Sequence, residues 1–284
     1  MPDSFHLLEE TVTADVSRAL AEDVGTGDLT AHLIPEGTKA RARLLTRQSG
    51  VLCGCEWFHR TFDELDPDVE VYWHHRDGEE MVANTSVCEI EGRARPMLTA
   101  ERTALNFVQL LSGVATRTRQ FVRAVEGTRA RILDTRKTLP GLRIAQKYAV
   151  HTGGGMNHRL GLHDGILIKE NHILACGGLT QAVRRAQHEV SPGVMLQVEV
   201  ETLEQLREAL DAGATLILLD NFDLPAMREA VKVAGERAEL EASGGITLGT
   251  VRAIAETGVH RISVGSLTKD VAAHDLSLRF MHHA

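Results

Sequence analysis

Three things are scarce in this sequence: cysteine, long apolar runs and positive charge. The four cysteines, Cys53, Cys55, Cys88 and Cys176, form no C-x-x-C pair, which argues against a zinc ribbon. Apolar runs such as residues 215–219 fall far short of the roughly 20 residues that cross a bilayer, and no basic-then-apolar leader precedes them. These absences favour reduced thiols and a cytoplasmic protein without a membrane partner.

The charge balance excludes another class of partner. Lys and Arg number 31 against 39 Asp and Glu, which gives a net charge of −8 with neutral His. Such a chain is poorly suited to bind nucleic acid or an anionic membrane over a broad surface. Any anion site must therefore be local.

The 284 residues suffice for about two domains at roughly 150 residues each. An amphipathic helix carrying Leu7, Val12, Val16 and Leu20 opens an α+β domain, with short strands over 39–46, 69–73 and 86–90. We place this domain at 1–112 and expect a C-terminal helix over 270–284 to pack back on it. A long helix over 100–123, capped by Thr99 and breaking at Ser112-Gly113, leads into the second domain at 113–269.

From about residue 130 the pattern alternates between strands and helices. The predicted strands cover 131–133, 165–168, 195–198, 216–219, 238–242 and 261–264, and helices include 202–211 and 247–257. Repeated strand–helix–strand units imply a parallel sheet with right-handed crossovers. The pattern alone leaves open whether this sheet closes into a barrel.

Polar residues follow each predicted strand, and in parallel α/β folds the active site forms at these carboxyl ends. Four basic residues and a histidine would make a cationic pocket suited to carboxylates or phosphates: Arg136, Lys137, Arg159, Lys169 and His158. Two small-residue turns, Ser243-Gly244-Gly245 and Gly265-Ser266, offer backbone N–H groups for a phosphate. Two acidic residues, Glu199 and Asp220, are oxygen ligands suited to Mg²⁺.

Simpler interpretations of these residues remain open at this stage. Each basic residue can be a solvated rim charge, and each glycine pair an ordinary turn. Glu199 and Asp220 can instead cap the helices that follow them. The Gly153-Gly154-Gly155 run fits a mobile lid or a plain turn equally well.

Several long motifs resemble the quinolinate phosphoribosyltransferases, the nicotinate-nucleotide pyrophosphorylases (carboxylating) among the type II phosphoribosyltransferases. The resemblance spans nearly the whole chain and rests on EDVGTGDLT (22–30), LTAERTALNF (98–107), DTRKTLPG (134–141), NHRLGLHDGILIKENH (157–172), VEV (198–200), LLDN (218–221), EASGGI (241–246) and ISVGS (262–266).

The resemblance implies an N-terminal α+β sandwich domain, an incomplete seven-stranded α/β barrel and a homodimer with a shared active site, with hexamers left open. It implies a decarboxylating pentosyltransferase of NAD biosynthesis. Quinolinate and 5-phosphoribosyl-1-pyrophosphate would give nicotinate mononucleotide, pyrophosphate and CO₂, with Mg²⁺ as cofactor.

The motif positions imply roles for individual residues. Quinolinate would be bound by Thr135, Arg136, His158, Arg159 and Lys169, with Arg102 donated by the partner subunit. Lys137, Glu199 and Asp220 would act in catalysis, the two carboxylates on the metal side. The phosphate would be held by Ser243, Gly244, Gly245, Val264, Gly265 and Ser266.

Two other functions remain open. A class I aldolase-like barrel would use Lys137 or Lys169 as a Schiff-base nucleophile, which requires a less cationic pocket. A non-catalytic or retuned relative, including the paralogue linked to molybdenum transport, shares the same motifs.

Overall fold

The computed structural model describes residues 3–191 and 193–281, which divide into two compact units. Among the described residues, the first comprises 3–119, 139–154 and 270–281, and the second comprises 120–138, 155–191 and 193–269. The boundary expected after residue 112 falls inside helix α3 (Ala94–Ala124).

A four-stranded antiparallel sheet forms the centre of the first unit, in the order β12-β1-β5-β3. Its strands are β1 (Lys39–Thr46), β3 (Glu70–Trp73), β5 (Ser86–Arg93) and β12 (Leu276–Met281), and β2 (Gly50–Val51) pairs with β4 (Glu80–Met81) beside it. The helices of this unit are α1 (Asp3–Val24), α2 (Cys55–Asp63), α4 (Arg143–Thr152), the short η1 (Ala31–Leu33) and most of α3.

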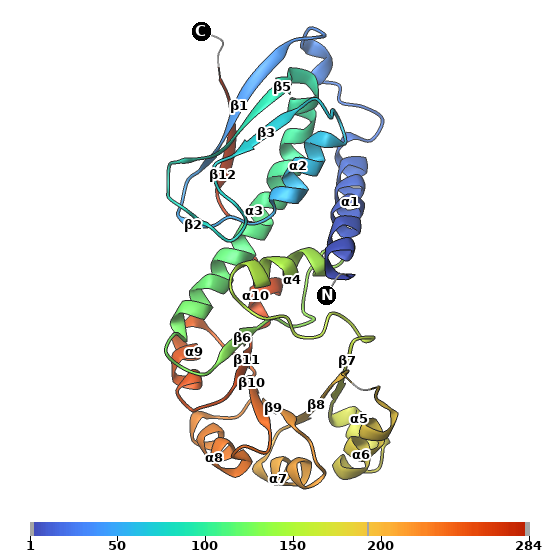
Figure 1. Cartoon of the computed structure of the whole chain (residues 1–284), viewed down its shortest axis with the longest axis vertical. Coiled ribbons are helices and arrows are strands. Elements are labelled where there is room, and N and C mark those ends of the chain that lie inside the picture. The colour runs from blue at the N-terminus through green and yellow to red at the C-terminus, as the bar shows by residue number, and fades with distance from the viewer. Residues whose placement is uncertain (1–2, 192, 282–284) are drawn as a thin grey trace. The chain divides into compact units, whose positions relative to one another are not determined.

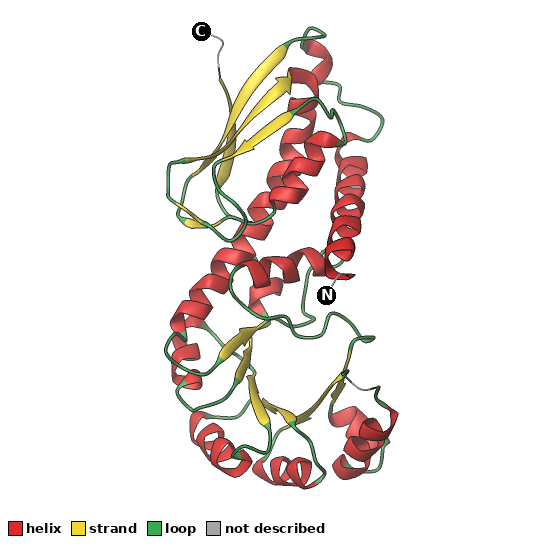
Figure 2. Cartoon of the chain, viewed as in Figure 1, coloured by secondary structure: helices red, strands yellow, loops and turns green. Residues whose placement is uncertain are grey.

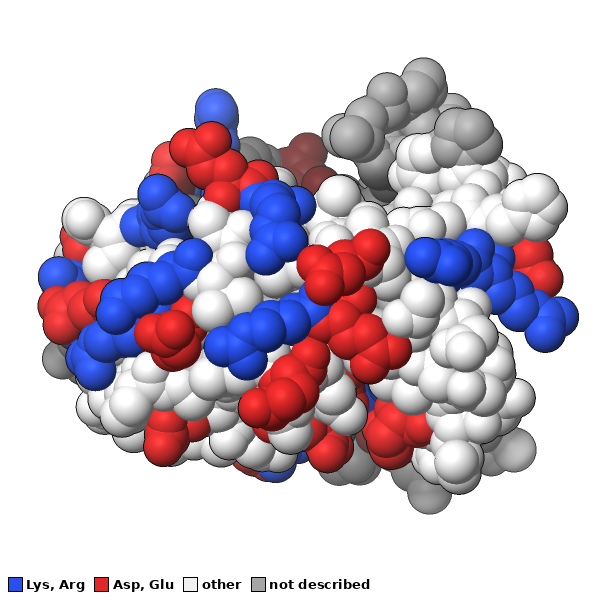
Figure 3. All heavy atoms as spheres, turned by 90° about the horizontal axis from the view of Figure 1, so that it is seen from below, with Lys and Arg blue, Asp and Glu red and all other residues white. Residues whose placement is uncertain are grey.

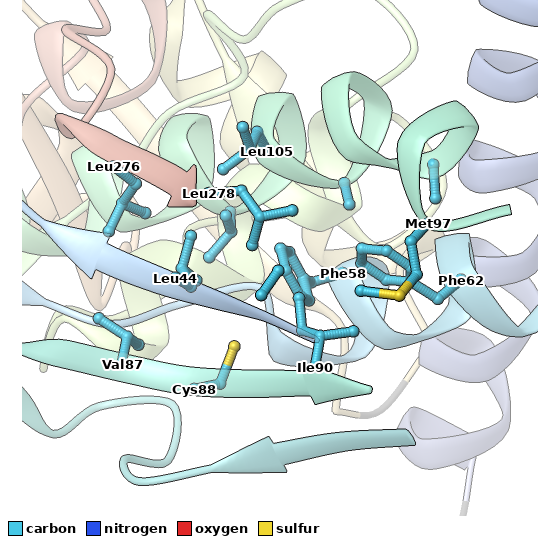
Figure 4. Close-up of a cluster of buried hydrophobic side chains, with 14 of the residues drawn as sticks. Leu44, Phe58, Phe62, Val87, Cys88, Ile90, Met97, Leu105, Leu276 and Leu278 are labelled. Carbon is cyan, nitrogen blue, oxygen red and sulfur yellow. The ribbon is translucent and has the colours of Figure 1, made fainter. Parts of the chain in front are cut away.

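Alternating apolar residues of this sheet pack against α2 and α3. Leu44 and Ile90 point from the sheet toward Phe58 of α2 and Met97 of α3, and all four are almost fully buried (Figure 4). This cluster is the core of the α+β domain that the sequence predicted.

The chain ends in a strand where we expected a helix. β12 pairs antiparallel with β1, placing Leu278 opposite Leu44. The apolar residues Leu276, Leu278 and Phe280 stand at every second position. In a strand their side chains share one face that can be buried, whereas in a helix the same side chains would point in different directions around the axis. The last three residues of the predicted helix, 282–284, lie outside the described part of the chain.

Helix α3 corrects two further expectations. It begins at Ala94, so Thr99 lies inside it and donates a hydrogen bond to the Asp28 carboxylate instead of capping the helix. It also continues through Gly113, where a Cβ atom would lie 2.1 Å from the carbonyl oxygen of Ala272. Gly113 therefore permits a close backbone approach rather than breaking the helix.

The second unit is a six-stranded parallel sheet in the order β6-β11-β10-β9-β8-β7. The strands are β6 (Arg131–Leu133), β7 (Gly165–Ile168), β8 (Met195–Val200), β9 (Leu216–Asp220), β10 (Glu239–Ser243) and β11 (Arg261–Ser263). They follow an arc with helices along its outer side (Figures 1 and 2). The helices are α5 (Glu170–Ala175), α6 (Leu179–Glu189), α7 (Leu203–Asp211), α8 (Leu224–Ala234), α9 (Leu248–Ala255) and the short α10 (Ser266–Lys269).

This sheet is a partial α/β barrel. The resemblance implied seven strands, and at the free edge of β6 Met156 forms a single parallel bridge with Leu133. The glycine run that precedes Met156 packs closely in the first unit, because a Cβ at Gly153 would lie 2.5 Å from the carbonyl oxygen of Ala115. This close packing explains why residue 153 is glycine, and no mobile lid is needed to account for it.

Charges of both signs alternate on the face shown in Figure 3. Ion pairs within the second unit include Arg261 with Glu239 and Arg252 with Glu256. Within residues 3–191 and 193–281, no helix is both long and apolar enough to cross a membrane.

Candidate active site

The carboxyl ends of the parallel strands bring most of the predicted site residues to one end of the second unit. Thr135 to Lys137 follow β6, Lys169 follows β7, and Gly265 follows β11. Arg102 lies on α3 in the first unit.

An ion pair joins two of these strand ends. Ile168 pairs with Val198 in the parallel register, so the next residues, Lys169 and Glu199, lie at the same level. Lys169 Nζ is 2.6 Å from Glu199 Oε2, and only 10% of the Glu199 side chain is exposed. The Glu199 carboxylate is therefore mostly buried and paired with one of the predicted cationic site residues.

Neither predicted metal-side carboxylate caps a helix. The N-cap of α7 is Thr202 and that of α8 is Asp223, and each side chain accepts a hydrogen bond from the backbone of its helix. Glu199 and Asp220 lie on the adjacent strands β8 and β9 and are free of that structural task.

The turn after β10 has a backbone that suits glycine. Gly244 and Gly245 have φ values of +107° and +58°, in the left-handed region. A Cβ at Gly244 would lie 2.1 Å from Asn221 Oδ1, whereas a Cβ at Gly245 would meet nothing within 4 Å. The turn is packed on one side and open on the other, so its backbone remains accessible to a ligand.

The turn after β11 packs against the β6 end. A Cβ at Gly265 would lie 3.1 Å from Lys137 Cδ, and Thr268 Oγ1 donates a 2.7 Å hydrogen bond to the Lys137 carbonyl oxygen. Ser266 Oγ is buried and has no hydrogen-bond partner among the described residues, whereas Val264 is a buried core residue. An unsatisfied buried hydroxyl beside Lys137 is suited to an anionic ligand.

Arg159 is partly buried and lies within the electrostatic influence of Arg136 and, with opposite effect, of Asp164. Arg159 Nη1 donates a 2.8 Å hydrogen bond to the Gly165 carbonyl oxygen, and burial together with the nearby Arg136 charge lowers the pKa of Arg159. Arg136 Nε is buried without a hydrogen-bond partner in the described part of the chain. Juxtaposed, partly desolvated guanidinium groups favour a multiply charged carboxylate ligand.

His158 is held by a buried network that the sequence analysis missed. Its Nε2 lies 2.8 Å from Gln197 Oε1, and Gln197 Nε2 donates to Glu241 Oε2 at 3.0 Å. Each newly found residue stands two positions before a predicted site residue on the same strand, Gln197 before Glu199 and Glu241 before Ser243. Residues two apart share one face of a strand, so this spacing was the signal that could have identified them.

The carboxylates do not form a closed metal site. No cluster of three or more His, Cys, Asp or Glu residues suited to a metal ion occurs within the described ranges. Glu199 and Asp220 instead provide one carboxylate each from neighbouring strands. This arrangement fits Mg²⁺ that retains waters and bridges to substrate phosphates, rather than an ion caged by protein ligands alone.

Comparison with known proteins agrees with this geometry. Residues 28–112 match the model of the quinolinate phosphoribosyl transferase N-terminal domain, and residues 114–279 match that of the C-terminal domain. A Bacillus subtilis protein described as a probable nicotinate-nucleotide pyrophosphorylase (carboxylating) is 43% identical over 257 residues, covering 90% of this chain and 89% of that protein.

A plant protein and a solved structure are similarly close. A mitochondrial quinolinate phosphoribosyltransferase (decarboxylating) 2b from Nicotiana tabacum is 40% identical, covering 92% of this chain and 80% of that protein. The nicotinate-nucleotide pyrophosphorylase structure from Francisella tularensis superposes with a TM-score of 0.93 at 44% identity and 96% coverage of both chains. With both domain models and near full-length relatives in agreement, this chain belongs to the quinolinate phosphoribosyltransferase family.

Proposed function

We propose that this family member catalyses transfer of a phosphoribosyl group from 5-phosphoribosyl-1-pyrophosphate to quinolinate, releasing pyrophosphate and CO₂ and forming nicotinate mononucleotide. The observations that carry this proposal are the buried Arg136 Nε, which has no hydrogen-bond partner among the described residues, and the Arg136 charge acting on partly buried Arg159, in a chain of net charge −8. Two fixed cations suit the two carboxylates of quinolinate, with His158 and Lys169 beside them.

The transfer needs positioning and electrostatics rather than a covalent nucleophile. The ring nitrogen attacks C1 of the ribose as pyrophosphate leaves, so positive charge develops on the sugar and negative charge on the leaving group. Lys137 and the turns at 243–245 and 265–266 would hold the phosphates, and the carboxylates of Glu199 and Asp220 would face the sugar.

The same pocket supports the decarboxylation. When the adjacent carboxylate departs as CO₂, the electron pair of the broken C–C bond stays on C2, where the positive charge of the pyridinium nitrogen formed in the first step stabilises it. A proton from solvent then bonds to C2 and completes nicotinate mononucleotide. Arg159 would bind one quinolinate carboxylate through its guanidinium while its backbone is held by His158.

Glu199 and Asp220 would hold Mg²⁺ that arrives with the diphosphate. A bound Mg²⁺ neutralises charge on the departing pyrophosphate. Lys169, already paired with Glu199, would balance the carboxylate in the absence of substrate.

Arg102 supports a homodimer with a shared site. It is exposed on α3, one helical turn after Leu98. Three exposed leucines belong to the same unit: Leu29 (86%), Leu33 (80%) and Leu98 (36%). Apolar side chains near an exposed arginine suit contact with a second copy, to whose site Arg102 would contribute.

A reducing, cytoplasmic setting is consistent with the thiols. All four cysteines are free, and burial raises the pKa of the Cys53 and Cys88 thiols. Such thiols are inert core groups rather than reactive ones.

The aldolase alternative is disfavoured by the surroundings of Lys169. A Schiff-base lysine needs an amine freed from its proton, whereas Lys169 lies 2.6 Å from a carboxylate. Lys137 packs along Gly265 next to the proposed phosphate turns.

The deciding experiment incubates the purified protein with 5-phosphoribosyl-1-pyrophosphate, Mg²⁺ and quinolinate carrying a labelled 2-carboxylate. We expect equal amounts of nicotinate mononucleotide, pyrophosphate and labelled CO₂, and no product with nicotinate in place of quinolinate. Absence of turnover would favour the non-catalytic or retuned relative. Borohydride-dependent labelling of Lys137 or Lys169 with a carbonyl substrate would establish the aldolase instead.

A further inference from the structure

We infer that Glu241 is a positioning residue: through Gln197 it fixes the orientation of the His158 ring, and thereby the backbone from which Arg159 reaches the substrate. This inference rests on the proposed function for the identity of that substrate. It concerns two residues, Gln197 and Glu241, that have no other role in the reaction.

Donors and acceptors in this series of hydrogen bonds can be assigned in only one way. The backbone N–H of Arg159 can only donate, and it lies 2.8 Å from His158 Nδ1, so Nδ1 must be the acceptor. A neutral imidazole that accepts at Nδ1 carries its proton on Nε2. That Nε2–H donates to Gln197 Oε1 at 2.8 Å.

The hydrogen bond to Glu241 explains why the Gln197 amide turns its oxygen toward His158. Gln197 Nε2 donates to Glu241 Oε2 at 3.0 Å, so the carboxyl oxygen of Glu241 is the acceptor. Rotating the Gln197 amide would place its oxygen against the carboxylate and its NH₂ group against the imidazole N–H. Glu241 thus selects the Gln197 orientation that gives His158 Nε2–H an acceptor and holds the ring in place.

The burial of Glu241 argues for a task beyond packing. Glu241 and Gln197 are 0% exposed, and Glu241 Oε1 has no hydrogen-bond partner among the described residues. That oxygen lies 3.8 Å from His158 Nε2. A buried carboxylate with an unsatisfied oxygen costs free energy, so an apolar side chain would serve packing better.

The consequence for Arg159 follows from its two anchors. Its backbone nitrogen is held by His158, and its guanidinium is held by the carbonyl oxygen of Gly165. The Arg159 side chain packs closely against Gly165, because a Cβ at residue 165 would lie only 3.2 Å from Arg159 Cβ. Loss of the hydrogen bond to His158 would let the Arg159 backbone move while the Arg159 guanidinium stays bound to Gly165.

The test uses Glu241→Gln, which preserves shape but can both donate and accept. Gln197 is then free to turn over, and we expect the dissociation constant for quinolinate, measured by calorimetry, to rise roughly tenfold, as for loss of one buried hydrogen bond. The dissociation constant for 5-phosphoribosyl-1-pyrophosphate should change little. Glu239→Gln, two residues earlier on β10 and half exposed, is the matched control and should bind both ligands like wild type.

A reciprocal exchange separates orientation from packing. In the double variant Gln197→Glu/Glu241→Gln, residue 197 is a carboxylate that accepts from His158 Nε2–H and from the new amide. We expect this exchange to recover most of the quinolinate affinity that Glu241→Gln loses. Failure of the exchange to recover affinity, or unchanged affinity in a folded Glu241→Gln protein, overturns the inference.

The tautomer gives a readout independent of turnover and of any variant's folding. In ¹⁵N-histidine-labelled wild-type protein, long-range ¹H–¹⁵N spectra should show His158 protonated at Nε2 and not at Nδ1. A proton on Nδ1 contradicts the chain of hydrogen bonds. If wild-type protein fails to bind quinolinate, the proposed function fails, while the spectra of folded Glu241→Gln still test the role of Glu241: an unchanged His158 Nε2–H signal in that variant overturns it.

Discussion

Single side chains set the ligand class of this site. Burial and the Arg136 charge disfavour the charged form of Arg159, and in the proposed site a dianion between the two guanidinium groups would relieve that repulsion. This relief would favour a ligand with two carboxylates over one with a single carboxylate.

Replacing Arg136 by alanine should therefore weaken quinolinate binding selectively. We expect a loss of about 2 to 5 kcal/mol, because removing one partner leaves a buried charge unpaired. Initial-rate kinetics should show the KM for quinolinate rising far more than that for the ribosyl donor. Arg136→Lys should restore little, since an ammonium lacks the guanidinium fork. Equal weakening of both substrates would remove Arg136 from the quinolinate pocket.

A substitution at Gly265 should weaken binding of the ribosyl donor rather than of quinolinate. A methyl group there presses on Lys137 Cδ at 3.1 Å, so Gly265→Ala should displace the lysine and raise the KM for the ribosyl donor severalfold. Gly249→Ala, in α9, meets only Thr247 Oγ1 at 3.8 Å and provides the control. A Gly265→Ala enzyme with wild-type kinetics would show that Lys137 does not depend on this contact.

At the scale of elements, close backbone approach decides where glycine is needed. Helix propensity predicts that alanine at a helical glycine adds roughly 1 kcal/mol of stability. At Gly113 the carbonyl oxygen of Ala272 reverses this expectation, because it lies 2.1 Å from the position of the new Cβ.

Gly113→Ala should lower the free energy of unfolding by about 1 to 3 kcal/mol, the usual cost of overpacking. Gly249→Ala, inside a helix with open space around it, should be neutral or stabilising. Urea denaturation of both variants checks the pair. A stabilised Gly113→Ala protein would mean that residues 272–273 shift at no cost.

The hydrogen bonds between Arg93 and Asp66 make a contribution to stability that depends on pH. Arg93 at the end of β5 donates to both oxygens of the buried Asp66, at 2.7 and 2.6 Å, and these hydrogen bonds lower the pKa of Asp66. A carboxyl whose folded pKa lies below its unfolded pKa stabilises the fold above the unfolded value, and that stability is lost as pH falls through the folded pKa.

Arg93→Met should therefore cost about 1.5 to 3 kcal/mol of unfolding free energy near neutral pH, the range for hydrogen bonds to a charged group. The difference from wild type should shrink below about pH 4, where the unfolded chain takes up the proton. Arg41→Met, which breaks the exposed pair with Glu91, should cost less than about 1 kcal/mol. A pH-independent difference at Arg93 would point to lost packing instead.

At the scale of the whole molecule, Arg102 tests the proposed assembly. Arg102→Ala and Lys137→Ala should each be nearly inactive alone. Mixed subunits should recover up to about a quarter of wild-type activity, since half of the dimers are hybrid and half of their sites intact. Rate measurements after verified subunit exchange check this. No recovery would place Arg102 in its own subunit's site or in none.

The sequence by itself determined the class of the fold and the set of charged residues. Period-two and helical apolar patterns are local, so they identified the α+β region, the six parallel strands and the polar residues that follow them. The long motifs then pointed to the family. These features depend on spacing along the chain, which the sequence records directly.

Only the tertiary structure decided what depends on distant neighbours. The strand at the C-terminus exists because β1 offers Leu278 a partner, and α3 passes through Gly113 because the chain near Ala272 requires the space. The network of His158, Gln197 and Glu241 joins a loop and two strands far apart in sequence. The two-residue spacing can place Gln197 and Glu241 on the same strand faces as Glu199 and Ser243. It cannot say that their side chains meet each other and His158, because those contacts arise from the register of strands that pair only in the folded barrel.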